Sequence, residues 1–366
     1  MKATAGIFLA TICWVSAVMA AEVAVLEEAY MAVPQQYAKK ISAADFAVLV
    51  LKGLHAVDEN LQVADDGRRV SLYYKARVIK SFLKPEAEDD TVAWASLSGK
   101  VIDQAIEVSP RAQAKEFEIN DLILKDAVAH LDGDSKYYAA GGENDRRVKN
   151  RRPFAAKTED GFLLLKVRAF NAYTRQLISE AVKEHKDFDA VILDLRGCPG
   201  GMTAEAIAVA DLFMDEGIIA STRGRRAENN VYYQAESGDI VNGKPMAVLI
   251  DGETASSAEV VAAALQEQSR AKVLGSRSFG KGSLQDLILL GDGATVALTG
   301  AYFYSPSGRP LHQNGVLPDV CTGGIDDVAN LEKFVSAAPA EGCPPEDRGE
   351  NDFDVEAAKA LLRQNL

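Results

Sequence analysis

Two stretches with the same layout decide the fold: AVILDLRGCPGG at residues 190–201 and MAVLIDGETASS at residues 246–257. Each begins with an apolar run of strand length, passes through a turn and leads into a helical pattern. Apolar strands separated by helices indicate a parallel α/β core with right-handed crossovers. The expected elements are strands at 190–195, 217–221, 246–250 and 272–274, and helices at 204–213 and 257–268.

The N-terminal part of the chain has a different spacing of apolar residues. Apolar residues recur at helical spacing in three N-terminal segments, and a turn at Asp65-Asp66-Gly67 predicts a β-hairpin. We therefore predict an α/β protein with a mainly helical N-terminal segment that contains a hairpin. The expected parts are a signal peptide at 1–20, an N-terminal domain at 21–140, a connector at 141–160, an α/β core at 161–325 and a C-terminal extension with a terminal helix at 326–366.

Composition and the first residues indicate where the protein acts. The net charge of −13 over 366 residues argues against nucleic acid and anionic membrane surfaces as partners. Lys2, the apolar run at 5–20 and the small residues of Val18-Met19-Ala20 predict a signal peptide cleaved after Ala20. The alternative is an uncleaved anchor, and no later segment is apolar and long enough to span a membrane. We expect a periplasmic or secreted protein.

Export makes disulfides feasible for the cysteines that remain after signal cleavage. Cys321 and Cys343 lie in one Pro/Gly-rich stretch and could close a short loop, which would leave Cys198 unpaired in a tight buried turn. This pairing is a hypothesis, because spacing does not fix connectivity. The cysteines and histidines are not spaced as in a zinc site, and the sequence implies no metal or organic cofactor.

Ser256 stands at the start of the second helix and has two interpretations. Its side chain can cap the helix, which is the commoner role of such a serine. It can also act as a nucleophile, since the helix dipole and free backbone N–H groups would stabilise an oxyanion beside it. The glycine-rich turn at 196–201 could offer further N–H groups or be an ordinary tight turn. The nucleophile role of Ser256 is favoured over the cap role only if a general base lies nearby.

Lys281 is the candidate base. It lies between two glycines in FGKGSLQ, residues 279–285, and their conformational freedom allows a side chain to enter a crowded site. A buried amine loses its charge readily, and a neutral lysine can take the proton of a serine. Activity should then rise with pH. Gln285 could orient the amine. The alternatives for Lys281 are a surface lysine in a glycine-rich loop and a phosphate-binding turn, although the P-loop spacing is absent.

The ordered motifs resemble those of the carboxyl-terminal processing peptidases, also called tail-specific proteases. The resemblance is carried by ILDLRGCPGG at 192–201, by the 25-residue spacing from Ser256 to Lys281, and by Gln285. It continues in YSPSGR at 304–309 and GVLPDV at 315–320, and weakly in LDGDSKY at 131–137. It covers residues 120–320 and implies a crotonase-like core.

The resemblance also implies roles for these residues. Ser256 would be the nucleophile, Lys281 the general base and Gln285 its orienting partner. The oxyanion would be bound by backbone N–H groups of Ser257 and of Gly200 or Gly201. The implied function is an exported serine endopeptidase that hydrolyses polypeptide substrates without a cofactor.

One departure concerns the PDZ domain that this family usually inserts before the core. About two dozen residues separate Tyr138 from Phe162, too few for a domain of roughly a hundred residues. We expect the PDZ domain to be absent and tail specificity to be altered. The N-terminal domain could instead dock an adaptor protein or another copy of the chain.

Three alternatives stay open. The protein could bind a peptide or another ligand without catalysis, because one fold serves several functions. It could be a protease that needs a partner for activity. His312 could also serve as the base, although we interpret it as an exposed loop histidine.

Overall fold

The computed structural model describes residues 23–141, 153–236, 238–322, 343–347 and 352–364. The predicted signal peptide lies outside these residues. The chain divides into two compact units, each described here by itself. Unit 1 comprises Met1–Arg146 and Gln285–Gly300, and unit 2 comprises Arg147–Leu284 and Ala301–Leu366. This division differs from the predicted boundaries, because Gln285–Gly300 lies within the predicted core.

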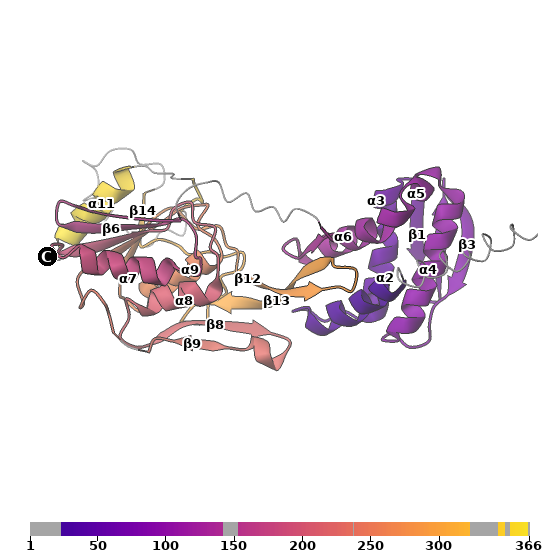
Figure 1. The fold of residues 1–366 in the computed structure, drawn as a ribbon, viewed down its shortest axis with the longest axis horizontal. Coiled ribbons are helices and arrows are strands. Elements are labelled where there is room, and N and C mark those ends of the chain that lie inside the picture. The colour runs from indigo at the N-terminus through magenta and orange to yellow at the C-terminus, as the bar shows by residue number, and fades with distance from the viewer. Residues whose placement is uncertain (1–22, 142–152, 237, 323–342, 348–351, 365–366) are drawn as a thin grey trace, which may run out of the picture. The chain divides into compact units, whose positions relative to one another are not determined.

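Unit 1 is a group of helices beside a three-stranded sheet of order β1-β2-β3 (Figure 1). Local caps fix its helix starts: Ser42 accepts a hydrogen bond from the Asp45 N–H, and Asp90 accepts one from the Ala93 N–H. The mainly helical segment with a hairpin is therefore confirmed. Its elements are the helical residues 23–36, α2 Ala43–Lys52, α3 Leu54–Val57, β1 Leu61–Asp65, β2 Arg69–Tyr74, β3 Arg77–Leu83, α4 Thr91–Val108, α5 Pro110–Ala114, η1 Glu116–Glu118, α6 Ile119–Asp132 and β4 Lys136–Tyr138.

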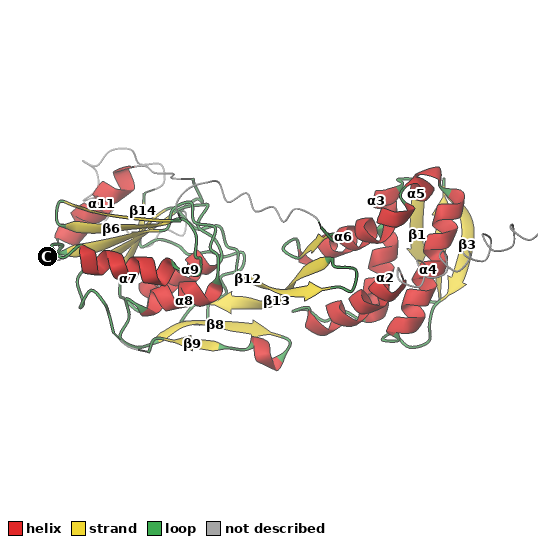
Figure 2. Ribbon diagram, viewed as in Figure 1, coloured by secondary structure: helices red, strands yellow, loops and turns green. Residues whose placement is uncertain are grey.

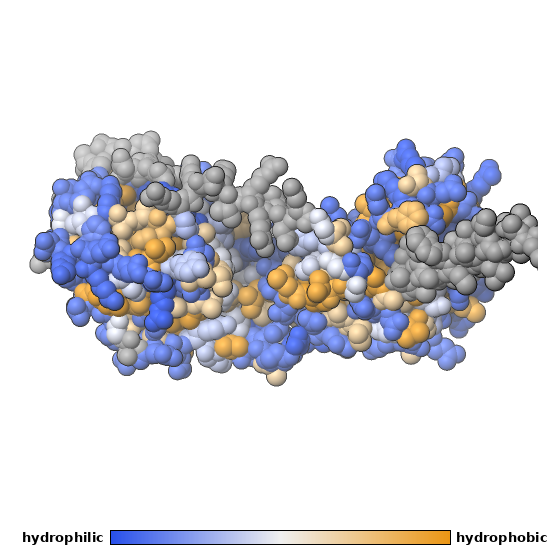
Figure 3. Space-filling model, in the orientation of Figure 1, coloured by the Kyte–Doolittle hydropathy of each residue, from blue (hydrophilic) through white to orange (hydrophobic). Residues whose placement is uncertain are grey.

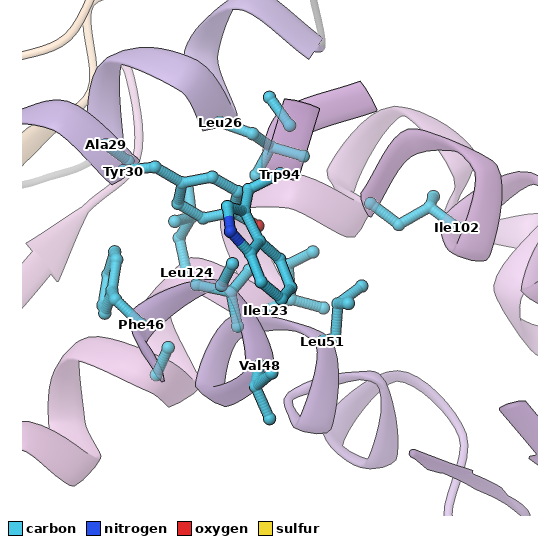
Figure 4. Close-up of a cluster of buried hydrophobic side chains, with 14 of the residues drawn as sticks. Leu26, Ala29, Tyr30, Phe46, Val48, Leu51, Trp94, Ile102, Ile123 and Leu124 are labelled. Atoms are coloured by element: carbon cyan, nitrogen blue, oxygen red, sulfur yellow. The ribbon is translucent and has the colours of Figure 1, made fainter. Parts of the chain in front are cut away.

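Large aromatic side chains form the centre of the unit 1 core (Figure 4). Tyr30 meets Phe46 edge to face, with ring centroids 6.0 Å apart, and Trp94 is 1% exposed. The Tyr30 hydroxyl is hydrogen-bonded to the Ser98 hydroxyl at 2.9 Å. This satisfied polar group lets a tyrosine be fully buried without an unpaired oxygen.

Unit 2 is built on a six-stranded sheet of order β14-β11-β10-β7-β6-β5 (Figure 2). The five strands from β14 to β6 are parallel, and β5 is antiparallel at the edge. One face packs on α11, and the other packs on α7, α8 and α9. Its elements are β5 Phe154–Glu159, β6 Phe162–Val167, α7 Thr174–Glu184, β7 Ala190–Asp194, α8 Thr203–Asp211, β8 Ile218–Gly224, η2 Ala227–Asn229, β9 Tyr232–Gln234, β10 Met246–Ile250, α9 Ser257–Glu267, β11 Lys272–Gly275, β14 Val320–Cys321 and α11 Asp352–Arg363.

A second sheet has the order β12-β13-β8-β9, with β4 paired to β13. The strands β12 Ser283–Leu289 and β13 Thr295–Tyr304 are neighbours in this sheet, and each contributes residues to both units. In unit 2, Ala301–Tyr304 pairs antiparallel with β8. In unit 1, Thr295–Ala297 pairs antiparallel with β4.

The structure confirms the α/β class and corrects two elements. The strand expected at 217–221 does not join the parallel sheet, since β8 pairs antiparallel with β9 and β13. The predicted connector at 141–160 contains β5, an edge strand that is largely exposed. Local hydrophobicity does not encode which strands lie beside β8. The sequence of β5, FAAKTE, has neither an apolar run of strand length nor a strict alternation of apolar and polar residues.

The structure confirms the predicted cysteine pairing. Cys321 is joined to Cys343 by a disulfide, and Cys198 is a free, buried thiol. Hydrophilic residues cover much of the face seen in Figure 3, with apolar groups between them. Across the described ranges, no helix has the length and apolar character needed to cross a membrane.

Candidate active site

Ser256 occupies the turn between β10 and α9, at the carboxyl end of a parallel strand. Its backbone has φ 57° and ψ −126°, a conformation that is costly for a residue with a side chain. A sharp, strained turn between a strand and a helix is also how nucleophilic serines are presented in other hydrolases. Ser256 is half-buried. The outlier marks Ser256 as a candidate functional residue.

The glycine-rich turn after β7 packs directly on Ser256. A methyl group at Gly200 would lie 2.8 Å from the Ala255 carbonyl oxygen and 3.0 Å from the Ser256 Cβ. At Gly201 it would lie 2.1 Å from the Phe170 carbonyl oxygen. These contacts, at φ +94° and +147°, leave room only for glycine. The predicted convergence of the two turns is thus present in unit 2.

Glu259 joins the serine turn to the lysine loop. Its Oε2 accepts hydrogen bonds from the backbone N–H groups of Ser256 and Lys281, both at 2.8 Å. Its Oε1 accepts from the Gly280 N–H at 2.7 Å and from the Ser278 hydroxyl at 2.5 Å. One carboxylate therefore fixes the backbone of both Ser256 and Lys281.

Burial raises the pKa of Glu259, and the four hydrogen bonds that it accepts oppose this rise. The side chain is fully buried, and all four partners donate, which fits the ionised form. Sequence reasoning assigned no role to Glu259. The spacing of Ser256 and Glu259 is that of a capping box, and this signal could have indicated that the glutamate turns back to the serine.

Buried charges brace the other turn from behind. Asp194 accepts from Arg196 Nε at 2.9 Å and Nη2 at 2.8 Å, and its Oδ1 lies 3.1 Å from Lys166 Nζ. Arg196 Nη1 lies 3.1 Å from Asp354. Burial would raise the pKa of Asp194, but the bonds to Arg196 and the charges of Arg196 and Lys166 hold it below its ordinary value.

Asp251 links the two turns. Its Oδ1 accepts from the N–H groups of Gly197 and Thr254, both at 2.9 Å, and of Glu253 at 3.1 Å. The Thr254 hydroxyl also lies 3.0 Å from this oxygen. Removal of Asp251 would free both strand ends at once.

Two backbone N–H groups beside Ser256 have no acceptor in the part of the chain that the structure describes. They belong to Ser257, the first residue of α9, and to Gly201. The Gly200 N–H instead interacts with the Cys198 thiol. Unpaired N–H groups next to a serine are the arrangement that binds a developing oxyanion.

The structure brings the remaining predicted residues together only in part. No hydrogen bond joins the Lys281 amine to the Ser256 hydroxyl, two residues that both lie in the described region. Gln285 lies half-buried on β12, in the segment Gln285–Gly300 of unit 1. Its predicted contact with Lys281 stays a prediction.

His312 is half-buried rather than exposed, which corrects the interpretation from the sequence. Its ring lies 5.0 Å from that of Tyr302, and its backbone packs against Gly282, where a methyl group would lie 2.1 Å from the His312 nitrogen. The histidine therefore supports the lysine loop through its backbone.

Comparison with known proteins extends this evidence. The sequence pattern of peptidase family S41 matches residues 161–322. A carboxy-terminal-processing protease of Bartonella bacilliformis is 46% identical over 129 residues, which is 35% of this chain and 30% of that protein. A carboxyl-terminal-processing protease of Synechocystis is 33% identical over 181 residues, which is 48% of this chain and 42% of that protein.

A solved lipoprotein from Streptococcus agalactiae, 17% identical, has a TM-score of 0.52 over 73% of this chain and 89% of that chain. At this identity the likeness shows the fold alone. The S41 match contains Ser256, Glu259 and Lys281, the residues whose turns converge in unit 2. Residues 161–322 therefore match a peptidase S41 domain, and over this part the chain is similar to carboxyl-terminal processing proteases.

Proposed function

We propose that this protein is an exported serine endopeptidase in which Ser256 attacks the peptide bond and Lys281 moves the proton. The observation that carries the proposal is the Glu259 carboxylate, which binds the backbone of both residues. If Ser256 were only a helix cap, Glu259 would not need to bind the backbone of the lysine loop as well. The strained backbone of Ser256 supports the same role.

In the proposed reaction, the neutral Lys281 amine accepts the proton of the Ser256 hydroxyl as the oxygen attacks the carbonyl carbon. The negative charge on the carbonyl oxygen is stabilised by the N–H groups of Ser257 and Gly201. Collapse of the tetrahedral intermediate breaks the C–N bond, and the leaving amine takes the proton from Lys281. Water then hydrolyses the acyl-enzyme, with Lys281 as base again, and Gln285 orients the amine.

Gly201 is preferred to Gly200 as the second donor, because the Gly200 N–H already interacts with the Cys198 thiol. Polypeptides are the proposed substrates. The chain spans less than half the length of the two relatives above, so their activity is carried over only as part of this proposal. The proposal that the protein is exported rests on the signal-peptide pattern of residues 1–20.

Hydrolysis of casein by the protein, beside Ser256→Ala and Lys281→Ala, tests the proposal. Each variant should lose at least about a thousandfold in turnover, as expected when a nucleophile or its base is removed. Matched controls are Ser307→Ala and Lys272→Ala, exposed residues of the same types in unit 2. Both controls, and His312→Ala, should stay active. Cleavage that survives Ser256→Ala would contradict the proposal.

A second candidate is a peptidase that becomes active only on binding a partner or substrate. The missing hydrogen bond between Lys281 and Ser256 favours it, since catalytic contacts often tighten only in the complex. An adaptor or a second copy of the chain at the N-terminal domain would be such a partner. Casein left intact by the protein alone, but cleaved in a host periplasmic extract that contains it and not Ser256→Ala, would support this candidate.

A further inference from the structure

A short segment near the C-terminus, residues 343–347, contacts the turn that leads from β10 to Ser256. We call this segment the strap. The Gly252 N–H in the turn donates to the Glu346 carbonyl oxygen of the strap at 2.6 Å. A methyl group at Gly252 would lie 2.9 Å from the Glu346 nitrogen, so the two backbones are in direct contact. The mechanism above gives the strap no role.

Ser276 forms a second link between the strap and the end of β10. Its hydroxyl donates to the Glu346 carbonyl oxygen at 2.8 Å and accepts from the Glu346 N–H at 3.1 Å. The Ser276 N–H donates to the carbonyl oxygen of Ile250, the last residue of β10, at 3.2 Å. Ser276 is fully buried, so loss of these partners would be costly. Glu346 thus restrains the backbone from which the turn begins.

The strap acts on the turn at a position that the rest of the site depends on. Gly252 directly follows Asp251, whose carboxylate accepts from the N–H groups of Gly197 and Thr254. A shift of the backbone at Gly252 would therefore also move the group that links the two turns. Thr254 precedes Ser256 by two residues, so this shift would reach the proposed nucleophile.

A disulfide anchors the strap to the parallel sheet. It joins Cys343, the first residue of the strap, to Cys321 of β14. Cys321 is paired with Gly275 of β11, and the Cys343 Sγ lies 3.7 Å from the Gly275 carbonyl oxygen. Cys343 is buried. The disulfide therefore ties the strap to two neighbouring strands.

Two prolines carry this restraint from the disulfide to Glu346. Pro344 and Pro345 directly follow Cys343, and their rings fix the backbone angle φ. Both prolines are exposed, so burial of apolar surface does little to hold them in place. The position of Glu346 on this side therefore depends on the disulfide.

We propose that the Cys321–Cys343 disulfide is a redox switch for the peptidase, with Glu346 as a positioning residue for the Ser256 turn. When the S–S bond forms, the two thiols transfer two electrons and two protons to a disulfide oxidant, which becomes two thiols. A dithiol reductant reverses the exchange. Disulfides persist in oxidising compartments and are rare in the cytosol, so the chain becomes fully active only after export. The inference rests on the proposed function for export and hydrolysis.

Amide hydrogen exchange, read by mass spectrometry, tests the switch without turnover. The parent protein is compared as the disulfide and after reduction by dithiothreitol, with reduction checked by mass. A peptide covering residues 251–257 should exchange at least about fivefold faster when reduced, the factor expected for one lost hydrogen bond. A peptide covering β7 should keep its protection, which separates local release from global unfolding. Equal exchange at 251–257 in both forms would overturn the inference.

Hydrolysis of labelled casein is measured on the same two forms. Reduction should lower kcat at least about fivefold with little change in KM, because the strap positions the Ser256 turn and not the substrate. Reoxidation with oxidised glutathione should restore kcat. A disulfide that only stabilises the fold would leave kcat of the folded, reduced protein unchanged, and that result would overturn the switch.

Two variants locate the effect. The double variant Cys321→Ser/Cys343→Ser should match the reduced parent, and a response of this variant to dithiothreitol would refute the role of this disulfide. Ser276→Ala removes a partner of Glu346 and keeps the disulfide, so it should show the faster exchange and lower kcat while oxidised. Ser307→Ala, an exposed serine, is the matched control and should change neither. If the double variant does not fold, the reduced parent and Ser276→Ala decide.

The two proposals fail separately. Casein left intact by both forms, with faster exchange at 251–257 on reduction, would contradict the endopeptidase and retain the redox control of the turn. Casein cleaved equally by the oxidised and the fully reduced protein would contradict only the switch.

Discussion

The turn after β7 and the turn after β10 lie side by side at one edge of the sheet, but different forces hold them. Buried ion pairs of Arg196 with Asp194 and Asp354 brace the first turn. The second contains the strained Ser256 and is held by one carboxylate that accepts backbone donors. Ion pairs fix side chains behind a turn, whereas the Glu259 bonds fix the backbone itself. The second arrangement couples Ser256, the proposed nucleophile, to the loop that carries Lys281.

Substitution of Glu259 should give the largest combined effect on stability and activity. Glu259→Ala leaves four buried donors without an acceptor. We expect the free energy of unfolding to fall by about 4 kcal/mol and casein hydrolysis to be lost. Glu259→Gln keeps the volume and one oxygen, so the loss should be smaller. Urea unfolding and hydrolysis rates measure both. Glu267→Gln, at the other end of α9, is the control, and a comparable loss there would refute the special role of Glu259.

Substitution of Arg196 tests the first turn. Arg196→Met leaves Asp194 and Asp354 buried without this partner, which should cost about 3–5 kcal/mol in the free energy of unfolding at neutral pH. Arg226→Met, in an exposed pair with Glu228, should cost at most about 1 kcal/mol. If Arg196→Met is neutral in urea unfolding, the buried charges do not stabilise the turn.

The same pair predicts a pH dependence. Because the pKa of Asp194 is lowered in the folded protein, its ionised form adds stability above the unfolded pKa of about 4, and this is lost as pH falls through the folded value. Urea unfolding between pH 7 and pH 3 should show this loss. The curve of Arg196→Met should be flatter, and two parallel curves would argue against the assignment.

Gly200 tests the contact between the two turns. Gly200→Ala should cost about 1–3 kcal/mol in unfolding free energy and reduce turnover, because its methyl group meets Ala255 and Ser256. Gly67→Ala is a matched control, since Gly67 has φ +91° and nothing within 4 Å. It should show only the conformational cost of about 1 kcal/mol. Equal effects at the two positions would mean that the contact is unimportant.

Cys198 should give the smallest effect. Burial raises the pKa of its thiol to about 12, so almost no thiolate is present near neutral pH, and the residue is fully buried. Iodoacetamide should not modify the native protein or change hydrolysis, and it should label Cys198 only in urea. Rapid labelling of the native protein would show that the first turn opens readily.

The strands β7 and β10 could be predicted because a strand buried on both faces needs an apolar run, and residues 190–193 and 246–250 have one. Strand β5 was missed because its sequence, FAAKTE, combines apolar and polar residues without a clear strand pattern, and its edge position leaves four of its six residues exposed. The prediction that β8 joins the parallel sheet was wrong, because a short apolar strand does not encode which strand lies beside it.

The sequence by itself determined the α/β class and the candidate residues Ser256 and Lys281, because apolar periodicity and ordered motifs are local properties. Gln285 as the orienting residue stays a prediction. Only the tertiary structure decided that Glu259 binds the backbone at both Ser256 and Lys281, and that Gly200 packs on Ser256. Hydrogen bonds and close contacts between segments far apart in the chain depend on how the strands order themselves. No local pattern carries that information.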